Sequence, residues 1–412
     1  MAGGCSGRTV ASMTESTHPH VLIVGGGVAA LETLIALRDL AEGRVTITLV
    51  APEVAFSYRP MKVAEPFSVG HAREYELADV ARHFDAAIIR DKVAEVRAED
   101  HAVGCEGGQD LSYDHLVLAT GARARPAFRH AITFGDDPAE MRLHRMLADL
   151  EEGYAQRVAF VVPSDTAWTL PLYELALMTA RQAWSMGMDR IRFSLVTPEE
   201  RPLAMFGAPA SEEIAELLAG HAIDFVGSSY ASVGRGYVLA DPGGRRIDAN
   251  RVVALPILEG LDLPGVPADA GGFMPADPHG RVPGLTGVYA AGDGTTFPIK
   301  QGGLATQQAD AVAETIAAEV GAPVQPEPFR PVLRGMLLTG GDERYMRHGV
   351  AGGAGDGELA DHALWWPPTK IAGRYLSAYL FGRDEGHVVE DVRAGHVEVE
   401  ISLAACATAR SS

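Results

Sequence analysis

Short apolar runs alternate with longer stretches of helical pattern along the chain, and this pattern predicts an α/β fold. Residues 21–24 are an apolar run, a glycine turn follows, and apolar positions then recur at helical spacing as far as Leu40. Residues 45–50 form the next apolar run. A strand, a glycine turn, a helix and a second strand in this order are typical of the start of a parallel sheet. We therefore expect ordered structure from His20 onward, after a disordered tail over residues 1–19.

A second unit of the same kind begins near residue 158. Residues 158–162 have the pattern of a strand, residues 171–186 that of a helix, and residues 191–196 that of another strand. Residues 227–254 contain glycine-punctuated turns between short apolar runs. The repetition suggests a duplicated domain.

The remaining apolar runs complete the outline. A strand over 116–119 ends in Thr120-Gly121, and a strand over 288–291 ends in Gly292-Asp293 before a helix over 303–320. The predicted fold class is α/β, with two Rossmann-like, three-layer ββα dinucleotide-binding domains and a C-terminal portion. The expected limits are 20–130 with 255–325 for the first domain, 131–254 for the second and 326–412 for the C-terminal domain.

The glycine turn at residues 25–30 has the G-x-G-x-x-A spacing of a dinucleotide-binding loop. Gly25 permits the tight turn, Gly27 lets a pyrophosphate approach the backbone, and Ala30 keeps the helix close to the sheet. The phosphates are expected at the helix N-terminus, where Val28 and Ala29 offer unpaired N–H groups.

An acidic residue for the ribose hydroxyls is expected about 20 residues further on. Ala51 directly follows the second strand, and Glu53 is the nearest carboxylate. Two readings stay open: Glu53 binds the ribose from a lengthened turn, or the ribose contacts are made by backbone alone and Glu53 is a solvated loop charge.

Three motifs in order resemble those of one family. The loop at residues 25–30, the strand end with Thr120 and Gly121, and the strand end with Gly292 and Asp293 are similar to the FAD-contacting motifs of the pyridine nucleotide-disulfide oxidoreductase superfamily. The resemblance implies that Thr120 and Gly121 lie near bound FAD and that Asp293 binds its ribityl or pyrophosphate region. An alternative for Asp293 is a helix N-cap.

Two further stretches are similar to those of sulfide:quinone oxidoreductases and type II NADH dehydrogenases. One is residues 56–60 with Arg59, and the other is residues 300–305. The resemblance implies that Gly303, Leu304 and Ala305 begin a helix under the flavin, with Lys300 adding a positive charge beside it. Arg59 would reach the pyrophosphate. The competing readings are a surface lysine and a surface salt bridge.

The second domain lacks the glycines of a nicotinamide site. Its first strand is followed by residues 163–171 without any glycine. Pro163 has no N–H for a phosphate, Asp165 would repel it, and Trp168 fills the space it needs. Glu199 stands where a ribose-binding acid is expected. We predict weak or no binding of NAD(P)H.

Three cysteines occur, Cys5, Cys105 and Cys406. None falls in the stretches around 163–170 and 333–345, where the resemblance to sulfide:quinone oxidoreductases implies a redox pair. Cys105 is expected in an exposed turn. The persulfide chemistry of that branch therefore lacks its residues.

The C-terminal portion carries an aromatic cluster and a predicted helix over residues 371–381. The cluster comprises Trp365, Trp366, Tyr375, Tyr379 and Phe381. It suits either a quinone pocket with peripheral membrane contact or plain domain packing. Lys370 resembles a lysine near the flavin in sulfide:quinone oxidoreductases.

The composition of the chain limits the kinds of partner that it can bind. The 412 residues carry a net charge of −19, which disfavours a nucleic-acid partner. No apolar run is long enough to span a membrane, and the cysteine usage favours a cytoplasmic protein. The sequence thus predicts an FAD-dependent oxidoreductase that passes two electrons from a small-molecule donor to a quinone or another acceptor. The alternatives are an NAD(P)H:quinone-type dehydrogenase and a flavin-binding protein without turnover.

Overall fold

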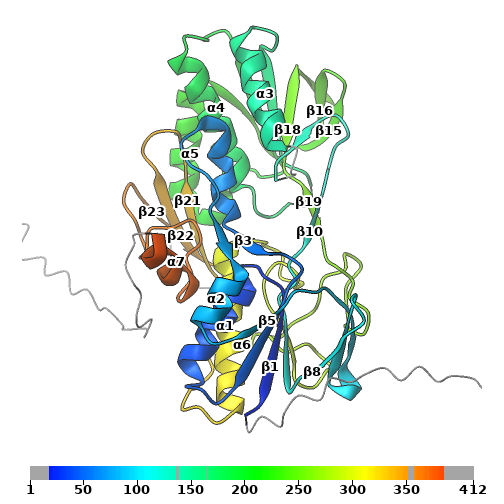
Figure 1. Cartoon of the computed structure of the whole chain (residues 1–412). Helices are drawn as coiled ribbons and strands as arrows, with labels where there is room; N and C mark the ends of the chain where they lie inside the picture. Colours follow the sequence, from blue (N-terminus) through cyan, green and yellow to red (C-terminus); the bar gives the residue numbers. More distant parts are fainter. Residues whose placement is uncertain (1–17, 136–138, 165, 351–356, 385–412) are drawn as a thin grey trace, which may run out of the picture.

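A five-stranded parallel sheet forms the lower half of the molecule in Figure 1. The computed structural model describes residues 18–135, 139–164, 166–350 and 357–384. In sheet order the strands are β20 (Val288–Ala290), β9 (His115–Leu118), β1 (His20–Val24), β2 (Thr46–Val50) and β5 (Ala87–Ile89). Val24 pairs with Val50 and Leu118, and Leu118 pairs with Ala290. The carboxyl ends of these strands therefore meet at one edge of the sheet.

Each face of this sheet carries its own layer. The helices α1 (Val28–Leu40) and α6 (Gly302–Glu319) pack on one face, where they bury a core that includes Leu31, Leu34 and Ile316. A three-stranded antiparallel sheet packs on the other face. Its strands are β6 (Val93–Arg97), β7 (Ala102–Cys105) and β8 (Asp110–Ser112).

The upper half of Figure 1 repeats this three-layer plan. Its parallel sheet has the order β11 (Ile132–Thr133), β18 (Arg251–Ala254), β12 (Arg157–Val161), β13 (Arg192–Val196) and β14 (Ile223–Val226). The helices α3 (Ala139–Glu151), α4 (Leu170–Ser185) and α5 (Ala208–Gly220) share a core on one face. The hairpins of β15 (Tyr230–Gly234), β16 (Tyr237–Asp241) and β17 (Arg245–Asp248) cover the other. The predicted pair of ββα domains is confirmed.

A two-stranded ribbon joins the halves (Figure 1). It pairs β10 (Arg123–Arg125) with β19 (Ile257–Glu259). Glu259 accepts hydrogen bonds from Arg123 at 3.2 Å and Arg125 at 2.5 Å, so both crossings of the chain are tied together.

The C-terminal portion begins with a third sheet, of β21 (Val332–Leu337), β22 (Arg344–Gly349) and β23 (Glu358–Ala360). The last helix, α7 (Leu376–Asp384), lies against α1. The expectation that this helix starts at residue 371 was wrong. Ser377 Oγ donates to Ile371 O at 2.5 Å and accepts from Gly373 N at 2.7 Å, so residues 371–375 form a turn that precedes the helix.

Smaller elements connect these layers. β3 (Ala55–Ser57) pairs with β4 (Glu74–Glu76), and α2 (Leu77–His83) follows directly. None of the helices in the described part of the chain combines the length and apolarity needed to cross a bilayer. The domain limits expected above stay a prediction, although the strands of each sheet fall within them.

Candidate functional site

The three glycine-containing motifs meet at the carboxyl edge of the first sheet. Gly25 has a φ of +126°, and a Cβ there would lie 2.2 Å from the carbonyl oxygen of Ala119. A Cβ on Gly294 would lie 3.0 Å from the carbonyl oxygen of Gly121, and one on Gly292 would lie 3.0 Å from Ala29 Cβ. Loops far apart in sequence are therefore in contact, and side chains larger than hydrogen would separate them.

The N-terminus of α1 is open to an anion. Gly27 is its N-cap, with no capping side chain and no acidic residue in the first turn. A Cβ on Gly27 would meet nothing within 4 Å. The first backbone bond of the helix runs from Leu31 N to Gly27 O, which leaves the N–H groups of Val28, Ala29 and Ala30 free within the described chain. A phosphate fits this cradle.

Asp293 lies beside the cradle as an acceptor without a donor. It is half-buried, and burial raises the pKa of its carboxyl, against the influence of Lys300 and Arg59. No hydrogen bond reaches its side chain from the described residues, and the N-cap of α6 is Gln301. The N-cap reading of Asp293 is therefore wrong. A sugar hydroxyl would satisfy this carboxylate.

The other predicted cofactor residues differ in their surroundings. Thr120 and Gly121 are half-buried next to Gly294. Arg59 is exposed at the start of a short helix over Arg59–Val63, near enough to Asp293 to lower its pKa. Glu53 is exposed in the loop after β2. Arg59 and Glu53 make no ion pair with other described residues, so both stay predictions as cofactor ligands.

Lys300 lies in the loop between Asp293 and α6. Its ammonium group donates to the carbonyl oxygen of Thr295 and lies 4.0 Å from the centre of the Phe273 ring. Burial lowers the pKa of Lys300 to about 8, although Asp293 and Asp269 act in the opposite direction. Lys300 is thus a half-buried cation held beside Asp293, and its role at the flavin stays a prediction.

The start of α6 is capped by its own chain. The side chain of Gln301 accepts from Leu304 N at 2.8 Å, and its backbone accepts from Ala305 N at 2.9 Å. The N–H groups of Gly302 and Gly303 are left in the first turn. The glycines also let the C-terminal segment approach, since a Cβ on Gly302 would lie 2.9 Å from Ile371.

Lys370 forms a buried ion pair across the molecule. Its ammonium group lies 2.6 and 2.7 Å from the carboxylate oxygens of Glu174 on α4, and the Lys370 side chain is 6% exposed. Glu174 also accepts from Leu338 N at 2.8 Å. Lys370 therefore ties the second domain to the C-terminal segment. The next residue of that segment, Ile371, contacts the start of α6.

In the second domain, side chains of the loop between β12 and α4 pack against neighbouring residues. The Trp168 ring packs edge-on against Phe206 with centroids 5.9 Å apart. The carboxylate of Glu199 accepts hydrogen bonds from three hydroxyl groups, those of Thr169, Tyr173 and Thr197, at 2.7 to 3.1 Å. An acid engaged in this way is not available to a ribose. Asp165 lies outside the described residues.

Cys105 is buried, and its predicted exposure was wrong. It ends β7 with 7% of its surface exposed and packs into the core between the two sheets. Burial raises the pKa of its thiol to about 11, which makes it a poor nucleophile at neutral pH. Cys5 and Cys406 lie outside the described residues.

The aromatic residues of the C-terminal portion form separate contacts rather than one cluster. Trp365 packs edge-on against Tyr345, and exposed Trp366 packs edge-on against Phe381. Tyr375 and Tyr379 are buried in the α1 and α6 core, which supports domain packing for those two.

A cavity of about 350 Å³ opens beside the loop that follows Asp293. Its walls include the rings of Phe297 and Phe329, which meet edge-on at 5.2 Å, and the polar side chains of Thr295 and Gln308. Asp277 and Thr296 also line it, so the cavity combines an aromatic wall with several polar side chains.

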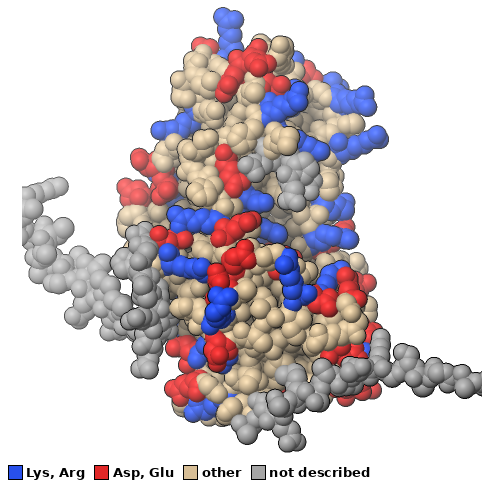
Figure 2. Space-filling view, viewed as in Figure 1, with Lys and Arg blue, Asp and Glu red and all other residues tan. Residues whose placement is uncertain are grey.

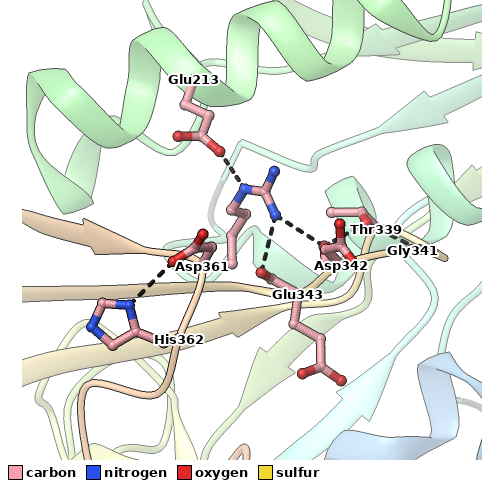
Figure 3. Close-up of polar contacts among 8 residues, drawn as sticks. Glu213, Thr339, Gly341, Asp342, Glu343, Asp361 and His362 are labelled. Carbon is pink, nitrogen blue, oxygen red and sulfur yellow. Dashed lines mark hydrogen bonds and ion pairs between the residues drawn. The ribbon is translucent and has the colours of Figure 1, made fainter. Parts of the chain in front are cut away.

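A second hollow, near β22, is lined by polar and charged residues that bond to one another or to their neighbours (Figure 3). Arg344 donates to Glu213 on α5 and to the backbone oxygens of Asp342 and Glu343, while His362 pairs with Asp361 at 3.1 Å. Nε and Nη1 of Arg344 are engaged in these bonds, so the cluster fixes the sheet of β21, β22 and β23 to α5. Within the described chain no grouping of side chains suits a metal ion. Figure 2 shows acidic and basic side chains intermixed on this face, without a continuous basic patch.

The acids Glu32 on α1 and Asp310 on α6 were not predicted to form a pair. Glu32 is fully buried and accepts from Tyr375 N at 2.9 Å and Leu376 N at 2.7 Å. In the sequence each acid is one of several polar residues of its helix, so no local pattern marked it.

Comparison with known proteins agrees with this architecture. Residues 19–161 match the family model of pyridine nucleotide-disulphide oxidoreductases. A sulfide-quinone reductase of Aquifex aeolicus is 26% identical over 221 residues, half of each chain. A mitochondrial sulfide:quinone oxidoreductase of Mus musculus is 26% identical over 126 residues, 29% of this chain and 27% of its own. The chain thus spans half or less of the length of these curated relatives.

Solved structures extend the likeness over most of the chain. The Aquifex aeolicus sulfide:quinone oxidoreductase superposes with a TM-score of 0.76 at 19% identity, over 90% of this chain and 92% of its own. A ferredoxin reductase from Rhodopseudomonas palustris gives 0.62 at 18% identity, over 89% and 94%. NDH2 from Plasmodium falciparum gives 0.55 at 15% identity, over 67% and 64%. Residues 19–161 thus resemble the pyridine nucleotide-disulphide oxidoreductase family, and the fold of the chain is similar to that of the sulfide:quinone oxidoreductase of Aquifex aeolicus.

Proposed function

We propose that this protein is an FAD-dependent oxidoreductase that takes two electrons from a small-molecule donor other than NAD(P)H and passes them to a quinone. The observation that carries the proposal is the open cradle at Gly27 beside the unpaired carboxylate of Asp293. When bound, FAD would supply the two-electron chemistry.

The cradle and Asp293 are complementary to two neighbouring parts of the dinucleotide, the pyrophosphate and a sugar hydroxyl. The free N–H groups of the first turn of α1 favour the pyrophosphate, and Asp293 favours a neutral hydroxyl donor. Arg59 is close enough to contribute a positive charge near the phosphates. Thr120 and Gly121 line the same edge of the sheet.

Two lysines are suited to handle protons. Lys300 has a pKa of about 8, so near neutral pH it can both hold and release a proton. Lys370 is held in place by its buried ion pair with Glu174. We propose that Lys300 stabilises negative charge at the flavin edge and that Lys370 supplies a proton to the reduced acceptor.

The filled loop at Trp168 and the internally bonded Glu199 argue against NAD(P)H as the donor. Cys105 argues against a thiol relay, since it lies on the face of the first sheet away from α1 and α6. The donor is therefore a small molecule oxidised at the flavin directly.

The quinone acceptor is suggested by the two curated relatives, a sulfide-quinone reductase and a sulfide:quinone oxidoreductase. We propose the cavity lined by Phe297 and Phe329 as its binding place, since both aromatic side chains can pack against a quinone ring. Phe329→Trp should slow oxidation of the reduced protein by a short-chain quinone. Oxidation by ferricyanide, which needs no cavity, serves as the control, and equal slowing of both would refute the placement.

An anaerobic titration of the purified protein separates the alternatives. The flavin absorbance should change little with NADH, bleach with dithionite and recover when a quinone is added. Rapid bleaching by NADH would favour the NAD(P)H:quinone-type dehydrogenase. Failure of the reduced flavin to be reoxidised by any acceptor would favour a flavin-binding protein without turnover.

A further inference from the structure

Fully buried Glu32 and half-buried Asp310 form an acid pair between α1 and α6. Both oxygens of Glu32 accept backbone N–H groups, of Tyr375 and Leu376, at 2.9 and 2.7 Å. The two side chains are also hydrogen-bonded to each other. Asp310 Oδ1 is buried and receives no donor from the described residues. Two carboxyl groups can share a hydrogen bond only when one carries a proton, so the pair holds a proton.

Charged groups surround the pair from every packed element. Arg374 precedes α7 and lies 3.5 Å from Glu314 of α6. Arg334 of β21 lies near Asp310 and beside Arg347. Asp39 of α1 and the hydroxyl of Tyr375 complete the set. Arg374 favours ionised Asp310, whereas Glu32 and Glu314 oppose it, and burial opposes it most.

The pair contacts the segment that covers the start of α6. We call residues 369–384 the C-terminal cap. Its Ala372 O accepts from Thr306 Oγ1 at 3.2 Å. Gly373 leaves no room for a side chain, because a Cβ there would lie 2.8 Å from Glu32 Oε2. The cap also carries Lys370. A carboxylate at the first turn of α7 is favoured by the helix dipole, so Glu32 holds the cap at its centre.

We propose that Glu32 and Asp310 are positioning residues, which with one shared proton latch the cap over the start of α6 and which release it when that proton is lost. Two negative charges in one buried site repel each other and are poorly solvated. Only the consequence for turnover, through Lys370, rests on the proposed function; the latch itself does not.

The direction of the pH dependence follows from the pair. Burial raises the pKa of both Glu32 and Asp310 above the usual carboxyl range. A raised carboxyl pKa stabilises the folded arrangement at low pH, and that contribution is lost as pH rises through the raised value. The cap should therefore loosen on the alkaline side, by about tenfold in its opening equilibrium per pH unit for one proton released.

Amide hydrogen exchange of the full protein with its flavin bound tests the latch. After correction for intrinsic exchange rates, protection of the cap peptides should fall with rising pH, while that of α5 stays constant. Asp310→Asn keeps a donor toward Glu32 but cannot titrate, so its cap should stay protected at every pH. Glu32→Gln has one acceptor oxygen for two N–H groups and should lose protection throughout. Asp39→Asn removes a nearby charge outside the pair and should behave as the native protein.

The native pH series alone can overturn the proposal, even if a variant fails to fold. Cap protection that is constant into the alkaline range would mean that no shared proton holds the cap. A pH dependence retained in Asp310→Asn would assign the proton to another group. Because exchange is measured without substrate, neither result bears on whether the protein is a quinone-linked oxidoreductase.

Discussion

The backbone N–H of Ile371 donates to the phenol oxygen of Tyr58 at 2.8 Å, and this bond ties the loop next to Arg59 to the C-terminal cap. Burial raises the pKa of Tyr58 to about 12, so the phenol stays neutral at physiological pH. Tyr58 on one side and Glu174 on the other hold consecutive residues of the cap, Ile371 and Lys370. The cap is thus fixed against both dinucleotide-binding domains.

Tyr58→Phe removes this bond and leaves the N–H of Ile371 without its acceptor. We expect a loss of about 1 kcal/mol in the free energy of unfolding and faster amide exchange at Ile371. Denaturant unfolding and exchange would measure the two effects. Tyr154→Phe, at an exposed tyrosine, is the matched control and should change neither.

Gly27→Val should abolish FAD uptake. The backbone of Gly27 is extended, with a φ of −92°, so valine is tolerated by the fold and acts only by filling the space meant for phosphate. Equilibrium dialysis with FAD measures the loss, and Gly220→Ala, where a Cβ also meets nothing within 4 Å, should bind normally. Undiminished binding by the valine variant would mean that the cofactor lies elsewhere.

Glu174→Ala leaves the Lys370 ammonium group buried without its partner. Removing one member of such a pair costs about 3–5 kcal/mol, and the double variant Glu174→Ala, Lys370→Met should recover much of that loss. Thermal unfolding of the set measures both. The exposed pair Lys92–Glu106 is the comparison, and its Glu106→Ala variant should lose no more than about 1 kcal/mol. Equal losses at both pairs would contradict the burial argument.

Lys300→Met should raise stability at neutral pH. The folded pKa of about 8 lies below the unfolded value, so above pH 8 the unfolded chain binds more protons and native stability rises with pH until the ordinary lysine pKa is passed. Below that window the folded protein bears the cost of a buried charge, which methionine removes. The difference in melting temperature between variant and native protein should therefore shrink as pH rises. A constant difference would place Lys300 in solvent.

NADH should reduce the flavin far more slowly than the roughly 10 s⁻¹ of a typical enzyme. The hydroxyl network around Glu199 and the packing of Trp168 leave no phosphate cradle. Rapid-mixing absorbance under anaerobic conditions gives the rate. If reduction proved fast and Glu199→Gln slowed it, the two results together would show that the second domain binds nicotinamide.

The sequence predicted the layers and the first cradle well because both depend on local patterns. Glycine spacing after a strand predicts the turn at Gly25, and apolar runs predict the two parallel sheets. The burial of Cys105 could not be predicted in this way, since it depends on β7 packing against a distant sheet. The start of α7 was misplaced because Ser377 ends the turn by a side-chain bond that helical periodicity does not report.

The acids Glu32 and Asp310 lay beyond sequence analysis for a different reason. Both helices contain other polar residues, so neither acid stands out in the sequence, and only the packing of α1 on α6 brings the two together. Likewise, Glu174 and Lys370 are 196 residues apart, and no local pattern indicates their contact.

The absorbance spectrum of the purified, acid-precipitated and resuspended fractions is the most direct test of the central claim. We expect a yellow protein that contains stoichiometric FAD. Acid should release this FAD intact into the supernatant, because Gly27 and Asp293 hold the cofactor without a covalent bond. A colourless protein that takes up no FAD on titration would contradict it.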